Sequence, residues 1–376
     1  MNSRERMLAA INHQLPDRVP TALWGGPYGL VDDLYYRLLE KLELGDPVPA
    51  FRKGHTINHL DDRLLDALET DARYIWPGAN PTSPRYPTEN PRYFKDSFGQ
   101  TWIQTLPYYS AGEGLLKNAA TVDEIDELVQ WPDVHDLEWT QGVTERAKNL
   151  GDKKEHFLIG RMVTSHGPFQ LASDLRGMDV FLLDMAARPD FASRLLERVT
   201  DVISGLLQNF VKAADGHLDL IELSGDDYAT NENLIFSPAM FRELIKPHIK
   251  KMVDAVRSVQ PEIKIMLHSD GAVGALMGDF VELGIDVFHP MEPVVGLDVN
   301  QIKEEYGSQI TFLGGIDITR AMPGTIEDVR KDVDRCLSDL GKDGGYILAP
   351  SNHLQHDVPA ENVIELFRYA RERGVY

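Results

Sequence analysis

Several apolar stretches of this sequence end in side chains that could do chemistry. The apolar run Ile265–Leu267 is followed directly by His268, Ser269 and Asp270. An imidazole and a carboxylate at the end of a strand can cap the helix that follows, or they can bind a metal, a proton or a polar ligand. Capping alone would explain Asp270, so the choice depends on what stands at the other strand ends.

Polar side chains follow other apolar runs as well. They are His166, Glu222, Asp226, Asp227, His289 and His353. Some have a structural alternative: His289 could be a hydrogen-bonded core histidine, and Asp226 with Asp227 could form a solvated turn. Together they favour a site, because several imidazoles and carboxylates on one rim are costly unless they bind a ligand.

The elements that must position these groups are short apolar runs rich in β-forming residues. Eight of them begin at residues 18, 72, 156, 218, 263, 285, 310 and 345. Segments with helical periodicity lie between the later runs, at 237–259 and 325–341. Alternating strands and helices indicate an α/β protein of parallel βα units, and eight units predict a (βα)8 TIM barrel. Active sites of that fold lie at the carboxyl ends of the strands.

Nitrogen and oxygen donors at these strand ends suit a divalent metal ion such as zinc. Glu222, His268 and His353 are the expected ligands, since they follow the fourth, fifth and eighth predicted strands. The sequence has no short-range ligand motif such as HExxH, so this set depends on strand positions alone.

Residues 80–112 interrupt the alternation of strands and helices. The segment is rich in proline and aromatic residues and has two strand-like pieces around Phe98 and Gly99. It therefore predicts a β-hairpin excursion after the second strand. No repeat or change in composition marks a second domain, so we expect residues 1–376 to form a single domain.

The overall charge limits the classes of partner. The chain has 59 acidic and 38 basic side chains, a formal net charge of −21, which repels phosphate backbones and anionic lipid. We therefore expect neither nucleic acid nor a membrane surface as a partner. Residues 1–20 contain no uninterrupted apolar stretch of the length of a signal-peptide h-region, and the single cysteine, Cys336, excludes an internal disulfide. These features predict a cytoplasmic protein with a buried Cys336 thiol.

Segments spread over nearly the whole chain point to a known family. They include RERMLAAINHQLPDRVP, KDSFGQTW, HGPFQLASDLRGMD, LHSDG and GGYILAPSNHLQHDVPAENVIELF. Together they resemble the uroporphyrinogen decarboxylase superfamily, which implies a TIM barrel and suggests a homodimer. The resemblance also implies one of two chemistries: decarboxylation of uroporphyrinogen, or transfer of a methyl group to or from a corrinoid protein.

Residues that bind the substrate in the decarboxylases of this superfamily are missing here. Their N-terminal segment RQAGR holds substrate carboxylates through arginine, whereas the matching residues 23–29 read LWGGPYG. Their aspartate that faces the pyrrole nitrogens falls within residues 74–79, YIWPGA, where no aspartate stands. The tyrosine that follows PWTL in the decarboxylases falls near Asp174 of this sequence, in the segment PFQLASD. We therefore expect that the protein does not decarboxylate uroporphyrinogen.

The superfamily's methyltransferases for thiol acceptors resemble this chain better, but they bind zinc through an HxC pair and a second cysteine. Here residues 268–270 read HSD and residues 348–352 read LAPSN, so both thiolates are absent. Zinc held by oxygen and nitrogen is a harder Lewis acid, suited to polarising an oxygen. The resemblance thus favours the O-demethylase branch, which passes a methyl group from a small methyl ether to cobalt(I) of a corrinoid (cobalamin-type) cofactor on a partner protein.

The remaining groups have supporting roles in this interpretation. Asp270 is expected to orient His268 or a water molecule. Asp226, Asp227 and His166 are expected to be polar contacts or proton donors in catalysis. The residues expected to bind substrate are Trp24, Trp76 and His289. Core packing is the structural alternative for the two tryptophans.

Two functions of other classes stay open. The chain could be a decarboxylase or lyase of another small acid, which would require a basic side chain at the mouth of the barrel. The strand ends named above are instead acidic and rich in histidine. The chain could also be a barrel that binds a small molecule without catalysis. A metal assay followed by a methyl-transfer assay separates the three.

Overall fold

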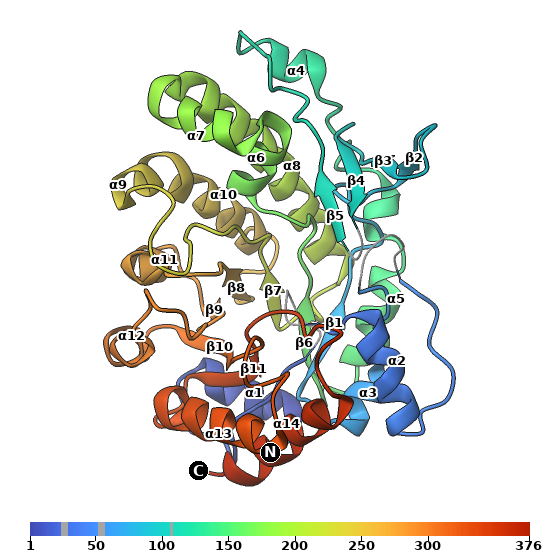
Figure 1. The fold of residues 1–376 in the computed structure, drawn as a ribbon, viewed down its shortest axis with the longest axis vertical. Helices are drawn as coiled ribbons and strands as arrows, with labels where there is room; N and C mark the ends of the chain where they lie inside the picture. The colour runs from blue at the N-terminus through green and yellow to red at the C-terminus, as the bar shows by residue number, and fades with distance from the viewer. Residues whose placement is uncertain (24–28, 52–56, 106–107) are drawn as a thin grey trace.

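A curled sheet of parallel strands forms the centre of the protein (Figure 1). The computed structural model describes residues 1–23, 29–51, 57–105 and 108–376. In this part of the chain, seven parallel strands pair in the order β1-β6-β7-β8-β9-β10-β11. Their bounds are Ala72–Ile75 (β1), Phe157–Gly160 (β6), Leu220–Glu222 (β7), Lys264–His268 (β8), Val287–His289 (β9), Thr311–Ile316 (β10) and Tyr346–Pro350 (β11). The fold is TIM-barrel-like, and seven of the eight predicted runs are confirmed as its strands.

Helices surround this sheet and follow most of its strands, as right-handed parallel crossovers require (Figure 1). Their bounds are Ser3–Ile11 (α1), Asp32–Lys41 (α2), Asp62–Ala67 (α3), Glu124–Leu128 (α4), Val143–Gly151 (α5), Pro168–Arg176 (α6), Met178–Ala187 (α7), Pro189–Ala213 (α8), Pro238–Met240 (α9), Lys246–Arg257 (α10), Met277–Glu282 (α11), Val299–Tyr306 (α12), Ile326–Cys336 (α13) and Ala360–Arg373 (α14). Both predicted helical segments are confirmed, and each contains a π-helical turn, at Phe241–Ile245 and Leu337–Gly341.

The predicted strand that begins at residue 18 is wrong in its extent. It is reduced to an isolated parallel bridge between Thr21 and Leu348 of β11. On the other side, the carbonyl of Thr21 accepts a hydrogen bond of 2.9 Å from the N–H of Asp71, next to β1. The segment therefore lies between the two edge strands, but Pro20 has no N–H with which to extend a ladder. Trp24, which was expected in the pocket wall, lies outside the described residues.

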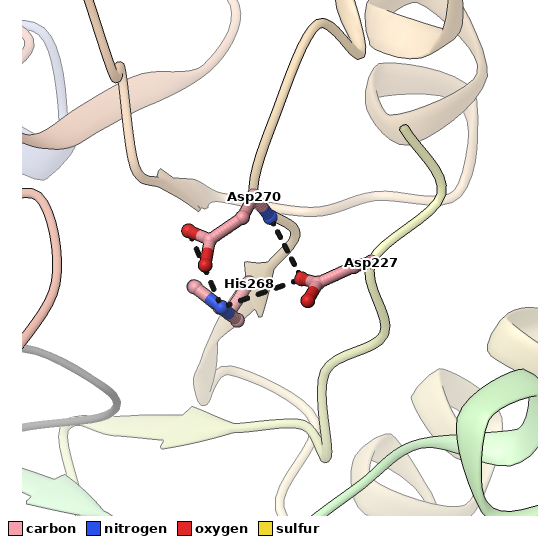
Figure 2. A group of neighbouring side chains, drawn as sticks. All are labelled: Asp227, His268 and Asp270. Atoms are coloured by element: carbon pink, nitrogen blue, oxygen red, sulfur yellow. Dashed lines mark hydrogen bonds and ion pairs between the residues drawn. The ribbon is translucent and has the colours of Figure 1, made fainter. Parts of the chain in front are cut away.

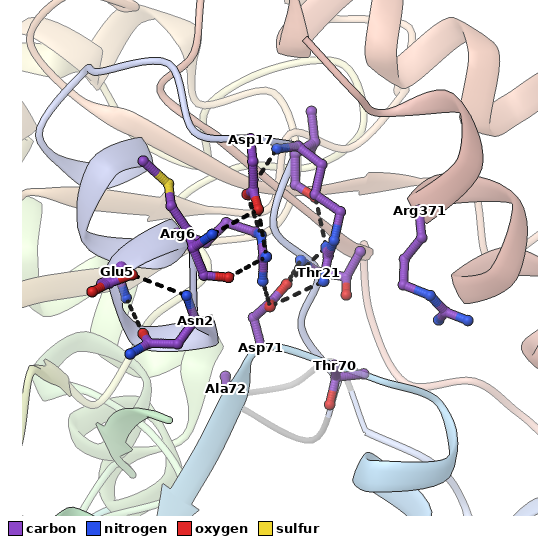
Figure 3. A network of polar contacts seen from close by, with 12 residues as sticks. Asn2, Glu5, Arg6, Asp17, Thr21, Thr70, Asp71, Ala72 and Arg371 are labelled. Carbon is purple, nitrogen blue, oxygen red and sulfur yellow. Dashed lines mark hydrogen bonds and ion pairs between the residues drawn. The ribbon is translucent and has the colours of Figure 1, made fainter. Parts of the chain in front are cut away.

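A network of ion pairs fixes α1 beside β1 (Figure 3). The fully buried carboxylate of Asp71 accepts from Arg6 Nη1 at 2.6 Å and from Arg18 Nη1 at 3.0 Å. It also accepts from the backbone N–H of Thr21 at 2.9 Å, and Asp17 accepts from Nε of Arg6 at 2.7 Å. Asp71 directly precedes β1, so this network lies at the amino end of the strands, where the barrel fold places stability rather than catalysis.

Residues 80–112 form an antiparallel excursion after β1, as the sequence predicts, with more strands than a single hairpin. Four strands pair in the order β2-β3-β4-β5 within the described residues. They are Tyr86–Pro87 (β2), Tyr93–Lys95 (β3), Thr101–Thr105 (β4) and Tyr108–Ala111 (β5). The β3–β4 pair is the hairpin around Phe98 and Gly99, and Gly99 adopts a positive φ of 82° in its turn.

The interior is a continuous apolar core between the sheet and its helices. Cys336 is fully buried in it, as predicted, and burial raises the pKa of its thiol to about 12. Among the helices in the described part of the chain, none combines the length and the apolar character needed to cross a lipid bilayer.

Candidate active site

Three side chains meet at the carboxyl ends of β7 and β8 (Figure 2). His268 is the last residue of β8, Asp270 follows it by two positions, and Asp227 lies in the loop after β7. His268 Nε2 is 3.7 Å from Asp270 Oδ1 and 3.8 Å from Asp227 Oδ1. One ligand atom from each of the three lies within 4.8 Å of the others. An imidazole and two carboxylates in this arrangement can hold a divalent cation.

A second imidazole orients His268. Nε2 of His289, the last residue of β9, lies 3.2 Å from the carbonyl oxygen of Pro350, which can only accept, so this Nε2 carries a proton. Burial lowers the pKa of His289 well below its ordinary value, so its Nδ1 accepts from the Nδ1–H of His268 at 2.9 Å. Burial also lowers the pKa of His268. The neutral ring of His268 therefore presents an Nε2 lone pair to the two aspartates, as a metal ligand must.

Asp270 has one oxygen held in place and one oxygen directed at the site. Its Oδ2 accepts from Asn352 Nδ2 at 2.7 Å, and its backbone N–H donates to Asp227 Oδ1 at 3.0 Å. Its Oδ1 is buried and receives no hydrogen bond from any described residue. Burial, and then the nearby Asp227 carboxylate, raise the pKa of Asp270 to about 7. A buried carboxylate oxygen without a donor, beside a neutral imidazole, fits a bound cation.

These groups line a cavity of about 250 Å³ at the strand ends. Its other polar lining residues are Asn80, Arg161, Ser165, His166, Gln170, Asn352 and His353. A second cavity of about 290 Å³ adjoins it and shares the lining residues Trp76, Asn80 and Met162. The second cavity is more apolar, and Phe51 stands in its wall, 4.2 Å between ring centroids from Trp76. The two spaces together are of the size that small molecules occupy.

Glu222, which was expected to be a metal ligand, lies beside the cavity and pairs with an arginine. Its carboxylate is completely buried and pairs with Nη1 of Arg161, the residue that follows β6. Strand register explains the contact, since Gly160 pairs with Ile221 and the next residues of both strands therefore lie side by side. Glu222 is not in the group of donors within 4.8 Å of one another, because its charge is directed to Arg161.

Asp226 and Asp227 are adjacent in sequence but point to different places. Asp226 is completely buried, and it accepts from the N–H groups of Phe169 at 2.9 Å and Gln170 at 2.8 Å in the first turn of α6. Gly167 permits this contact, because a Cβ there would lie 2.6 Å from Asp226 Oδ2. Burial raises the pKa of Asp226 to about 7. It caps a helix and does not line the cavity in the described structure, whereas Asp227 does.

His166 lines the cavity and is held by an acidic partner. Its Nδ1 lies 2.7 Å from Asp174 Oδ2. Burial by itself lowers the pKa of His166, but the Asp174 carboxylate outweighs it, and the pKa is raised above the ordinary value. His166 can therefore carry a proton near neutral pH, with Nε2 left to donate it.

The expected groups that remain are divided between the cavity and the core. His353 lines the cavity, and its Nδ1 accepts from the N–H of Gly29 at 3.1 Å. Trp76 lines both cavities, with the guanidinium carbon of Arg161 4.2 Å from its ring centroid. His289 is completely buried behind His268, where it acts as the hydrogen-bonded core histidine that the sequence left as an alternative.

Comparison with known proteins identifies the family. The profile of uroporphyrinogen decarboxylase (URO-D) matches residues 110–373, more than half of the chain. This chain belongs to the uroporphyrinogen decarboxylase family. It is 25% identical over 265 residues to uroporphyrinogen decarboxylase 2, chloroplastic, of Oryza sativa subsp. japonica, a match that covers 68% of this chain and 62% of the relative. It is 26% identical over 268 residues to uroporphyrinogen decarboxylase, chloroplastic, of Zea mays, covering 68% and 61%.

The chain spans about three fifths of the length of these two curated relatives. Among solved structures, a methyltransferase from Methanosarcina mazei superposes with a TM-score of 0.66 at 19% identity, covering 99% of both chains. That agreement shows a shared fold over the whole chain.

Some groups around the site of this uroporphyrinogen decarboxylase family member received no role from the sequence. They are Arg161, Asp174, Glu292 and Asn352. Glu292 is the acceptor for the N–H of Gly271, at 3.4 Å. Two of them stand at predicted strand ends and could have been found there: Arg161 follows the apolar run at 156–160, and Asn352 follows the run at 345–350. Glu292 also lies close to a strand end, shortly after β9, whereas Asp174 lies within α6, where strand position carries no signal.

Proposed function

We propose that this protein is a methyltransferase that takes a methyl group from a small O-methyl compound and passes it to a corrinoid carried by a partner protein. The observation that carries the proposal is the group of Asp227, His268 and Asp270 in a small cavity at the strand ends. A structural neighbour described as a methyltransferase shares the fold, which supports the same chemistry. An ether is a poor electrophile, so a group that stabilises the departing oxygen is required.

The donor set fits zinc, which the three residues would hold through one nitrogen and two oxygens. When bound, such an ion supplies Lewis-acid polarisation of an oxygen. The chain's own residues prepare this position in advance. His289 fixes the ring of His268, and Asn352 fixes Asp270, so neither ligand has to reorganise when a cation enters.

His166 supplies the proton that the reaction requires. As the methyl–oxygen bond breaks, the electron pair stays on oxygen, and the methyl carbon bonds to the nucleophilic acceptor. His166 lines the same cavity, and the Asp174 carboxylate favours its protonated form, from which the Nε2–H can be transferred to the oxygen that leaves. The Asp174 carboxylate stays behind and orients the ring, and a proton from solvent restores it after the product departs.

The methyl acceptor reaches the site from outside. A cavity of about 250 Å³ is smaller than the range of about 300–1,000 Å³ typical for drug-sized ligands. The much larger corrin macrocycle does not fit inside it. The corrinoid would therefore stay on its partner protein and approach the mouth of the barrel, while only the methyl donor enters the cavity.

The decisive experiment measures metal and methyl transfer on the same preparations. Purified protein is stripped with a chelator, reconstituted with zinc, and mixed with chemically reduced cobalamin and a panel of small methyl ethers. We expect one equivalent of zinc and formation of methylcobalamin that is lost on stripping and in His268→Ala. Zinc-free protein that transfers methyl groups at the same rate as reconstituted protein would refute the metal-assisted mechanism.

A second candidate function, decarboxylation of a small acid, has one observation in its favour. Such an enzyme needs a basic side chain at the barrel mouth, and Arg161 does line the cavity. Release of carbon dioxide from small acids by protein that transfers no methyl group would favour this alternative.

A further inference from the structure

The guanidinium of Arg161 is a buried cation whose hydrogen-bonding capacity is largely unused. The residue is only 4% exposed. Nη1 donates to Glu222, and the face of the guanidinium lies on the ring of Trp76. Nε–H is buried and donates to no described residue. Among the described residues, the guanidinium's hydrogen bond is the one from Nη1 to Glu222, so Nη2 has none. Since Nε–H and Nη2–H lie on one edge of the guanidinium, they form a fork that matches a carboxylate.

Glu222 and Trp76 hold this fork in a defined orientation. Glu222 is completely buried and fixes the Nη1 side, while Trp76 fixes the plane at 4.2 Å. An arginine that served only to neutralise Glu222 would be expected to use more than one of its five donors on a partner. Buried polar groups without a partner call for an explanation, and a ligand in the adjoining cavity supplies one.

We propose that Arg161 binds an anionic group, a carboxylate, on the small substrate of the cavity. This inference deepens the proposed function and rests on it: the methyl donor is a small acid, held at Arg161 by its carboxylate, with its reactive group toward Asp227, His268 and Asp270. Arg161 and these three residues line one cavity, so a single small molecule can contact both. The arginine also offsets the negative charge of the two aspartates, which would otherwise repel an acid.

Recognition by a fork makes the subsite specific. A carboxylate accepts two parallel charge-assisted hydrogen bonds from a guanidinium, whereas a carboxamide offers one oxygen and a donor that faces the N–H groups unfavourably. Acids should therefore bind better than their amides by about 10- to 100-fold. A lysine in place of Arg161 keeps the charge and the pair with Glu222, but it loses the fork and the contact with Trp76.

The test measures binding without turnover. Benzoate and benzamide are titrated calorimetrically into protein of residues 1–376, once stripped of metal and once reconstituted with zinc. We expect wild type to prefer benzoate by about 10-fold or more and Arg161→Lys to lose most of that preference while binding benzamide as before. Because Arg161→Gln alone would leave Glu222 buried without its cation, the second variant is the double change Arg161→Gln with Glu222→Gln, which removes both charges together. It should show no preference.

Three results would overturn the proposal. They are equal binding of benzoate and benzamide by wild type, no benzoate binding at millimolar concentrations, and a preference for benzoate that survives in the double variant. The last result, if it required zinc, would place the carboxylate on the metal. None of these measurements depends on methyl transfer, so the substrate assignment and the proposed function can fail independently.

Discussion

The neighbouring residues Asp226 and Asp227 allow one prediction that separates structure from chemistry. Both are aspartates in the loop that follows β7, yet Asp226 is buried against the first turn of α6, while the side chain of Asp227 is 39% exposed and faces His268. Asp226→Asn and Asp227→Asn are the same small chemical change one position apart. We expect Asp226→Asn to lower the stability of the fold and leave zinc affinity unchanged. We expect Asp227→Asn to lower zinc affinity and leave stability unchanged.

The magnitudes follow from the contacts. Asp226 accepts two backbone N–H groups at 2.9 and 2.8 Å, and an amide can accept only one of them well, so its loss should cost about 1–3 kcal/mol. For 376 residues the entropy of unfolding is about 0.8 kcal/mol/K, so the melting temperature should fall by about 1–4 °C. Asp227→Asn keeps an oxygen for the N–H of Asp270 but removes a charged ligand. Zinc affinity should then fall at least about 100-fold, beyond the usual effect of a residue outside the ligand set.

The assay uses two readouts on each variant. Calorimetric melting of the metal-free proteins reports stability, because bound zinc would otherwise raise the melting temperature by mass action. Competition with a chromophoric chelator reports zinc affinity. The reasoning is refuted if the two variants lose zinc equally, or if Asp226→Asn loses zinc and Asp227→Asn does not.

The other predictions concern stability and substrate. Asp71→Asn should lower the free energy of unfolding by about 3–5 kcal/mol, since it breaks a buried pair with Arg6; a change below 1 kcal/mol in urea titrations would contradict this. Burial lowers the pKa of His248 to about 4, so between pH 6.5 and 4 a proton binds to this histidine in the unfolded chain but not in the folded one. Up to roughly 3 kcal/mol of stability should therefore disappear as the pH falls from 6.5 to 4. Melting curves of His248→Gln should lack this component. Uroporphyrinogen should yield no coproporphyrinogen with purified protein, as chromatography of the products can check.

The positions of the candidate site residues could be expected from the sequence because strand ends can be recognised in it. His268 and Asp270 follow an apolar run and are two residues apart, so the same run that predicts β8 also places both at its carboxyl end. The same reasoning places Asp227 after β7. The tautomer of His268 could not be predicted, since it depends on His289, 21 residues away, and on a carbonyl of β11.

The sequence could not predict which side chains of neighbouring strands pair with one another. Glu222 was expected to bind metal, but its charge is taken by Arg161, 61 residues earlier in the chain, because β6 and β7 are neighbours in a particular register. Asp226 and Asp227 look equivalent in sequence, and only the position of α6 decides which one turns inward to cap it. The first predicted strand failed for a local reason, since the proline at position 20 limits the ladder to one bridge.

Arg161 also bears on the choice between decarboxylation and methyl transfer. In a decarboxylation the negative charge leaves the carboxylate for the adjacent carbon, so a guanidinium bound to that carboxylate stabilises the starting acid more than the transition state. A carboxylate on the fork of Arg161 is therefore better suited to hold the substrate than to react. The reacting bond would then lie at the other end of the molecule, toward His268, where His166 and the residues that would hold an oxygen-polarising ion line the same cavity. A basic residue that first suggests a decarboxylase thus fits a methyl donor that carries an acid group.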